Sequence, residues 1–271
     1  MTRLLSRLGR SLWTVYEYLA MVLGLGALAV LCLTWLPFAL LCSVLPRRAG
    51  TFVGRMAIMI GFRIYLHFLT IFCACRFDLR AVDALRRERP LILVANHPSL
   101  LDVVMIVSRL PDAVCVMKAA LMDNILLGAA ARLARYIRND SPMRMVRGAR
   151  SELQRGSHLV IFPEGSRTQD FPFDACTNAA GLIASSARVP VQALLIEFSS
   201  PYLGKAWPLF RKPELPLRFG IRLGRRFDPP DHGRAFAGVL EAYFREELAG
   251  PGNAASSCPA VPASRQESSA S

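Results

Sequence analysis

A long uncharged segment near the N-terminus constrains this chain more than any other feature. Residues 18–46 contain no charged side chain. A helix rises about 1.5 Å per residue, so a helix of this length exceeds the roughly 30 Å hydrocarbon core of a bilayer. The basic residues before it also fit a signal peptide, but the apolar run is too long and no small-residue cleavage pattern ends it. We therefore expect residues 1–48 to form a membrane segment.

Basic residues flank this segment on both sides, at positions 3, 7 and 10 before it and at positions 47 and 48 after it. The positive-inside rule orients a single span only when its two flanks differ. A helical hairpin bent near Pro37 would place both flanks in the cytosol. A tilted single span is the alternative.

A second apolar segment, residues 49–75, is interrupted by Arg55, Arg63 and His67. On a helix of about 3.6 residues per turn these three side chains fall within about 120° of arc. This pattern is typical of an amphipathic helix at the membrane interface. Packing of the same helix on the domain that follows is the alternative, and both can hold.

Short apolar runs alternate with helical patterns from about residue 76 onwards, which indicates an α/β domain over residues 76–249 with a largely parallel sheet flanked by helices. The final residues, 250–271, are rich in Pro, Ser and Ala and are expected to be a disordered tail. The expected strands are 91–95, 114–117, 159–162, 191–198 and 218–223, and the expected helices are 99–109, 119–135, 142–154, 175–187 and 235–248.

The net charge of +13 indicates a polyanionic partner, which can be nucleic acid, an anionic membrane surface or a phosphate-bearing substrate. The uncharged segment favours the membrane and opposes a nucleic-acid partner. The seven cysteines form neither a zinc pattern nor a disulfide framework. We therefore expect reduced thiols on a cytosol-facing domain, and no metal.

The first polar motif is Asn96-His97-Pro98-Ser99-Leu100-Leu101-Asp102, directly after a predicted strand. Ser99 and Asp102 have the spacing of a helix-capping pair, which is a purely structural interpretation. It does not explain His97, which lies where α/β sheets usually bind ligands. A carboxylate at Asp102 could orient the imidazole and stabilise it when it takes up a proton.

The second polar motif is Phe162-Pro163-Glu164-Gly165-Ser166-Arg167-Thr168, which also follows a predicted strand. Its side chains should therefore emerge at the same edge of the sheet as His97. Arg167 offers a planar donor fork that suits a phosphate, and Gly165 allows close backbone approach. An ordinary polar turn with a local ion pair is the alternative.

In this order and spacing, the two motifs resemble those of the phospholipid and glycerol acyltransferase family, which includes 1-acylglycerol-3-phosphate acyltransferases. The resemblance covers roughly residues 50–225. It implies that His97 is the general base and Asp102 its partner. It further implies a set of residues that bind the acceptor, namely Glu164, Gly165, Ser166, Arg167 and, by its position in Tyr136-Ile137-Arg138-Asn139-Asp140, Arg138.

Two departures from the family pattern leave the acceptor open. Arg138 stands one place early in its segment, and Ala193 replaces the second proline expected after Pro190. The resemblance implies acyl-CoA or acyl carrier protein as donor, a lysolipid hydroxyl as acceptor, in particular that of 1-acyl-sn-glycerol-3-phosphate, and no cofactor. A bacterial inner membrane with the domain on its cytosolic side is the expected location.

Two alternatives remain. One is acylation of a non-phosphate lysolipid such as an ornithine-lipid or pigment-type acceptor. The other is a catalytically silent lipid-binding protein, which the presence of both His97 and Asp102 opposes. Further arginines at positions 132, 135 and 138 and at 144, 147 and 150 are spaced along helix faces. They fit either solvated surfaces or contacts with anionic headgroups.

Overall fold

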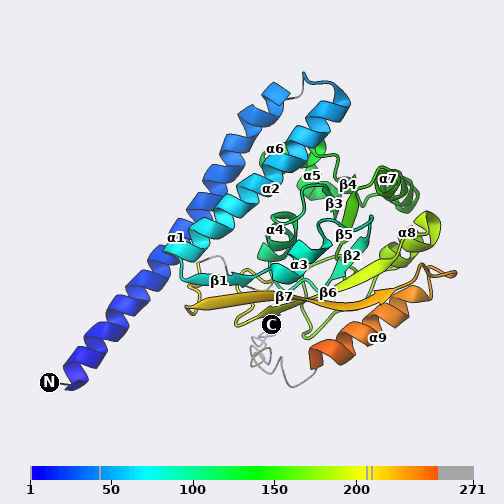
Figure 1. Ribbon diagram of the computed structural model, residues 1–271. Coiled ribbons are helices and arrows are strands. Elements are labelled where there is room, and N and C mark those ends of the chain that lie inside the picture. The colour runs from blue at the N-terminus through cyan, green and yellow to red at the C-terminus, as the bar shows by residue number, and fades with distance from the viewer. Residues whose placement is uncertain (1, 43, 206, 209, 250–271) are drawn as a thin grey trace, which may run out of the picture.

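The computed structural model describes residues 2–42, 44–205, 207–208 and 210–249. The expected tail, residues 250–271, lies outside the described residues. The domain is built on a seven-stranded sheet in the order β1-β7-β6-β2-β5-β3-β4 (Figure 1). The strands are β1 Cys75–Asp78, β2 Ile92–Ala95, β3 Ala113–Met117, β4 Ile137–Arg138, β5 His158–Ile161, β6 Val191–Phe198 and β7 Leu217–Phe227.

The sheet is largely parallel, as expected. Strand β2 pairs in parallel with β5 and β6, and β3 pairs in parallel with β5 and β4. Strand β7 runs antiparallel to β6, and β1 is parallel to β7. The carboxyl ends of β2, β5, β6, β3 and β4 therefore share one edge of the sheet, the carboxyl edge, and their starts share the opposite amino edge.

Helices cover both faces of this sheet (Figure 1). Side chains of a strand alternate between faces, so Leu93 and Ala95 of β2 join one core while Ile92 and Val94 join the other. The first core includes α2 (Arg47–Phe72), α3 and α4, and the second includes α7, α8 and α9. The helices of the domain are α3 Arg80–Leu85, α4 Leu101–Val107, α5 Ala119–Asp123, α6 Ile125–Leu133, α7 Pro142–Gln154, α8 Ala179–Ala187 and α9 Phe236–Ala249.

Two long helices precede the sheet and pack against each other, α1 Thr2–Cys42 and α2 Arg47–Phe72. They run antiparallel, and the N-terminal end of α1 extends past the domain (Figure 1). Both are long and apolar enough to cross a membrane. The expected bend near Pro37 is wrong, because Pro37 lies inside α1 and the chain reverses only after Cys42. Packing of α1 on α2 and α6 holds the helix together past the proline.

Several smaller elements differ from the expectation. The expected helix 119–135 is two helices, because Asn124 between them has an extended backbone. The short elements β1, α3 and β4 were not predicted, since two to six residues carry too little periodicity to be recognised. The division of the chain at residues 48, 75 and 249 stays a prediction.

The polar residues of α2 do not share one environment. The Arg55 side chain is 6% exposed and is held inside the protein. It donates to the Ala134 carbonyl, to Ser157 and to two carboxylates. Arg63 and His67 are exposed. Packing on the domain, the alternative interpretation of this helix, is therefore correct at Arg55.

Candidate active site

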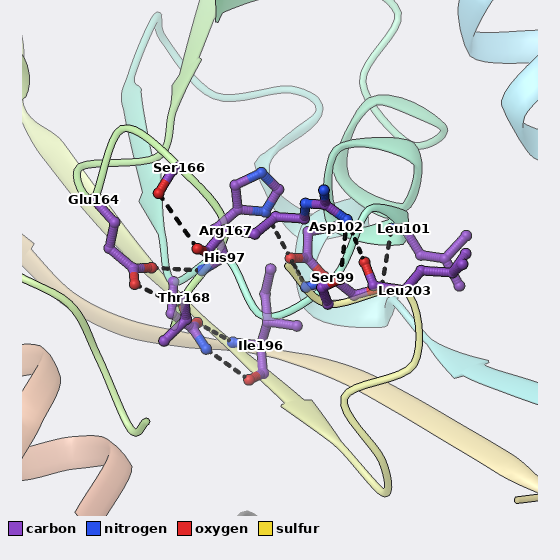
Figure 2. A network of polar contacts seen from close by, with 12 residues as sticks. His97, Ser99, Leu101, Asp102, Glu164, Ser166, Arg167, Thr168, Ile196 and Leu203 are labelled. Atoms are coloured by element: carbon purple, nitrogen blue, oxygen red, sulfur yellow. Dashed lines mark hydrogen bonds and ion pairs between the residues drawn. The ribbon is translucent and has the colours of Figure 1, made fainter. Parts of the chain in front are cut away.

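The two polar motifs meet at the carboxyl edge, beyond the ends of β2 and β5 (Figure 2). Asn96 fixes the base of this site. Its side-chain amide donates to the Ile196 carbonyl at 3.0 Å, and its Oδ1 accepts the Ile196 N–H at 2.7 Å. The end of β2 is thereby tied to β6 where the backbone ladder stops. The sequence shows Asn96 as the first residue of the motif, but its position alone gave it no role.

His97 and Asp102 form a direct pair. Nδ1 of His97 lies 2.9 Å from Oδ2 of Asp102, and the imidazole stacks on Phe162 with ring centroids 3.9 Å apart. The Asp102 side chain is fully buried, whereas that of His97 is 16% exposed. A carboxylate on Nδ1 favours the tautomer with its proton there, which leaves the lone pair of Nε2 available as a base.

Asp102 is held from several directions. Its Oδ2 also accepts the Ser99 N–H at 2.8 Å, while the Ser99 hydroxyl oxygen accepts the Leu101 N–H at 3.2 Å. The expected bond from the Ser99 N–H to Asp102 is present, but Ser99 is not the N-cap, because α4 begins at Leu101 and Leu100 occupies the cap position. Burial raises the pKa of Asp102, and the His97 hydrogen bond, the Ser99 amide and the Arg167 charge oppose this shift. Within the described part of the chain, Oδ1 of Asp102 has no hydrogen-bond partner.

Glu164 connects the two motifs. Its carboxylate accepts the His97 N–H at 2.8 Å, the Thr168 hydroxyl at 2.7 Å and the Asp174 N–H at 3.0 Å. Burial raises the pKa of Glu164, and these three donors oppose the shift. Both oxygens are therefore engaged within the protein, which is the arrangement of a residue that positions its neighbours. Direct binding of the acceptor by Glu164 stays a prediction.

The residues after Glu164 turn back towards His97. Gly165 is exposed and has a φ of +69°, a left-handed conformation that favours glycine. Arg167 donates through Nη1 to the carbonyls of Leu203 at 2.7 Å and Gly204 at 3.2 Å. Ser166 is half-buried and accepts a hydrogen bond from Lys205 at 3.4 Å. Arg167 thus lies beside the His97–Asp102 pair (Figure 2).

Arg138 lies apart from this cluster. It ends β4, which is three strands from β2 and hence about 14 Å away along the sheet. Its guanidinium donates to both carboxylate oxygens of Asp123, at 2.6 and 3.1 Å, and to Asp140 at 3.0 Å. The structure does not bring Arg138 together with His97, and its role at the acceptor stays a prediction.

The sequence of this domain is similar to known proteins. Residues 76–197, which carry both motifs, match the model of the family described as Acyltransferase. This segment is therefore similar to acyltransferase domains. Over 183 residues it is 29% identical to human 1-acyl-sn-glycerol-3-phosphate acyltransferase beta, covering 64% of this chain. The alignment spans 63% of the human protein, less than two thirds of its length.

The fold of the acyltransferase domain and its preceding helices is also known. The crystal structure of PlsC, the 1-acyl-sn-glycerophosphate acyltransferase of Thermotoga maritima, superposes with a TM-score of 0.65. The match covers 88% of this chain and 98% of that chain at 18% identity. The mostly parallel sheet, its flanking helices and the two long N-terminal helices therefore form a PlsC-like fold, and these helices suggest membrane association.

Proposed function

We propose that this protein transfers a fatty acyl group from an acyl thioester to the hydroxyl of a lysolipid, in particular 1-acyl-sn-glycerol-3-phosphate. The observation that carries the proposal is the contact of 2.9 Å between His97 Nδ1 and Asp102 Oδ2. The pair lies at the carboxyl edge of the sheet and within the segment that matches the acyltransferase family. A lipid-binding protein without activity would need neither residue.

His97 acts as a general base in the proposed reaction. Its Nε2 removes the proton from the acceptor hydroxyl while the hydroxyl oxygen attacks the thioester carbonyl carbon. The carbon–sulfur bond then breaks, and the proton passes from the imidazolium to the departing thiolate of CoA or acyl carrier protein. Asp102 stabilises the imidazolium in between. General-base catalysis of this kind contributes about 10²–10⁴-fold in rate.

Arg167 is suited to bind an acceptor phosphate. Among the described residues, protein groups engage only Nη1 of its guanidinium, so Nε and Nη2 remain available as donors. These two N–H groups form a planar fork that matches phosphate oxygens. Ser166 and Gly165 adjoin the fork and complete the proposed acceptor site, while Glu164 holds the backbone of His97 in register with it.

The proposed location is the inner membrane of a bacterium, with the acyltransferase domain in the cytosol. Support comes from the two apolar helices and from the cysteines, because the six that the structure describes are all unpaired. The outward faces of helices α1 and α2 are apolar. Exposed large side chains on α1 and α2 include Leu12, Trp13, Leu19, Val22, Leu33, Leu41, Phe52, Ile60, Ile64 and Ile71.

A panel of acceptors tests the proposal. The purified protein is given a labelled acyl thioester together with lysophosphatidic acid, a zwitterionic lysolipid or a lysolipid without phosphate. We expect transfer to lysophosphatidic acid, and an Arg167→Ala variant should raise the KM for this acceptor far more than the KM for the donor. Transfer to the acceptor without phosphate alone would contradict the acceptor assignment, and no transfer to any hydroxyl would contradict the activity.

A further inference from the structure

A buried ion pair joins α1 to the connection between β6 and β7, residues 199–216. The side chain of Glu17, which the site does not use, is 7% exposed and bonds Lys212. It also accepts the Leu215 N–H at 3.3 Å. Glu17 is the only acidic residue of α1. A carboxylate in so apolar a helix is unfavourable unless it is paired and hydrogen-bonded, and both partners come from this connection.

The first part of the same connection forms hydrogen bonds with both active-site motifs. The Ser99 hydroxyl donates to the Tyr202 carbonyl at 2.7 Å, and the Leu100 N–H donates to the Leu203 carbonyl at 3.2 Å. The Leu203 and Gly204 carbonyls orient Arg167. Gly204 also lies close to the first motif, since a Cβ at this position would lie 3.1 Å from the Pro98 carbonyl oxygen.

Aromatic and cationic side chains link the two ends. The Tyr202 and Trp207 rings meet edge to face with centroids 5.5 Å apart. The Arg211 guanidinium lies 4.8 Å from the Trp207 ring centroid, and the Trp207 indole N–H donates to the Arg211 carbonyl at 3.0 Å. Lys212 follows directly. A continuous set of contacts therefore runs from α1 to the carbonyls that hold Arg167.

We propose that Glu17 and Lys212 are positioning residues for the acceptor site, acting through the β6–β7 connection on Arg167. This inference rests on the proposed function, in which Arg167 binds the acceptor. Without the ion pair, the attachment of the connection to α1 is weakened, and the carbonyls of Leu203 and Gly204 fix the guanidinium less firmly. The apolar helix thereby orders the site that its lipid substrate enters.

Kinetics of Glu17→Gln and Lys212→Met test the proposal. Each should raise the acceptor KM roughly 3- to 30-fold, the range typical of coupling through packed contacts, and leave the donor KM within about twofold. The double variant should resemble either single variant, because both remove one interaction. Asp231→Asn is the matched control: it breaks the exposed pair with Arg188, at 3.0 Å, and should change neither KM.

Two further measurements separate this inference from the proposed function. In an Arg167→Ala background, Glu17→Gln should add little to the acceptor KM, since its effect passes through Arg167. Hydrogen exchange at the amides of residues 202–204 should accelerate in Glu17→Gln whatever the acceptor is. If the wild type transfers no acyl group, the proposed function is contradicted. The exchange measurement still tests whether Glu17 attaches the β6–β7 connection to α1.

The inference is overturned if the acceptor KM of Glu17→Gln stays at the wild-type value, if the exchange of residues 202–204 does not accelerate, or if the effects of Glu17→Gln and Arg167→Ala are fully additive. Should Glu17→Gln fold poorly, Lys212→Met provides the same measurements from the domain side. A reversed pair, Glu17→Lys with Lys212→Glu, should then lower the acceptor KM below that of Glu17→Lys alone, although the bond from the Leu215 N–H stays lost. A wild-type KM in Lys212→Met would equally overturn the inference.

Discussion

Two buried ionic clusters lie at opposite edges of the same sheet, and they differ in how fully they are paired. At the amino edge, Arg55 bonds Asp112 at 2.5 Å, Ser157 at 2.8 Å and Glu152 at 2.7 Å, and its Nε reaches the Ala134 carbonyl at 3.0 Å. Every nitrogen of this guanidinium has a partner. The cluster fastens α2 to residues that precede β3, β4 and β5.

The carboxyl-edge cluster consists of His97, Asp102, Glu164 and Arg167, and some of its polar atoms have no hydrogen-bond partner in the described part of the chain. Within the described residues, Oδ1 of Asp102 has no partner, and Nε and Nη2 of Arg167 donate to no protein group. His97 retains partial exposure. Buried polar groups are normally satisfied, so this unused capacity distinguishes a site for chemistry from a structural attachment. Substitutions at the two edges should therefore have opposite consequences.

The largest expected effect is at the carboxyl edge. Asp102→Asn should lower the transfer rate about 10²–10⁴-fold, because a neutral amide in place of the carboxylate no longer stabilises the His97 imidazolium. The loss of free energy of unfolding should be only about 0.5–2 kcal/mol, since Asn can still accept the Ser99 N–H. Initial rates and melting temperature measure the two effects separately. Asp112→Asn, the matched change at the amino edge, should leave the rate per folded molecule within about threefold of wild type.

The next effect is at the amino edge and concerns stability. Arg55→Met should lower the free energy of unfolding by about 3 kcal/mol, the low end for breaking a buried ion pair, because Arg155 still contacts Glu152. Denaturation in detergent measures this change, with the exposed Arg63→Met as control, which should differ from wild type by less than about 0.5 kcal/mol. A rate loss per folded molecule as large as that of Asp102→Asn would remove the contrast between the two edges.

The smallest effect concerns pH. His158, buried at the start of β5, accepts the Leu91 N–H at 3.2 Å as a neutral ring. Burial lowers its pKa below the usual value of about 6.5. At this residue the unfolded chain therefore binds a proton more readily than the folded protein. The contribution of neutral His158 to the free energy of unfolding is complete above about pH 6.5. It decreases as the pH falls below that value, by at most about 1.4 kcal/mol per pH unit. Melting temperatures at pH 7.5 and 5.5 should differ less in His158→Asn, and an unchanged difference would refute this origin.

The carboxyl edge was more predictable from the sequence than the amino edge. Parallel strands end at a common edge, so the two motifs were expected at one edge, and the pairing of β2 with β5 brings His97, Asp102 and Arg167 together. Arg55 was harder, because its spacing with Arg63 and His67 describes one helix face and does not reveal what that face contacts. Glu17 and Lys212 are 195 residues apart and belong to no motif. Only the packing of α1 on the domain brings them together.

The central claim is that the carboxyl edge performs acyl transfer with His97 as the base. The most direct measurement compares the transfer of labelled acyl groups to lysophosphatidic acid by wild type, His97→Ala and His232→Ala, which changes an exposed histidine. We predict a loss of at least about 10²-fold in His97→Ala, with its melting temperature and membrane fraction retained, and wild-type rates in His232→Ala. Transfer by a folded His97→Ala variant within about tenfold of wild type would contradict it.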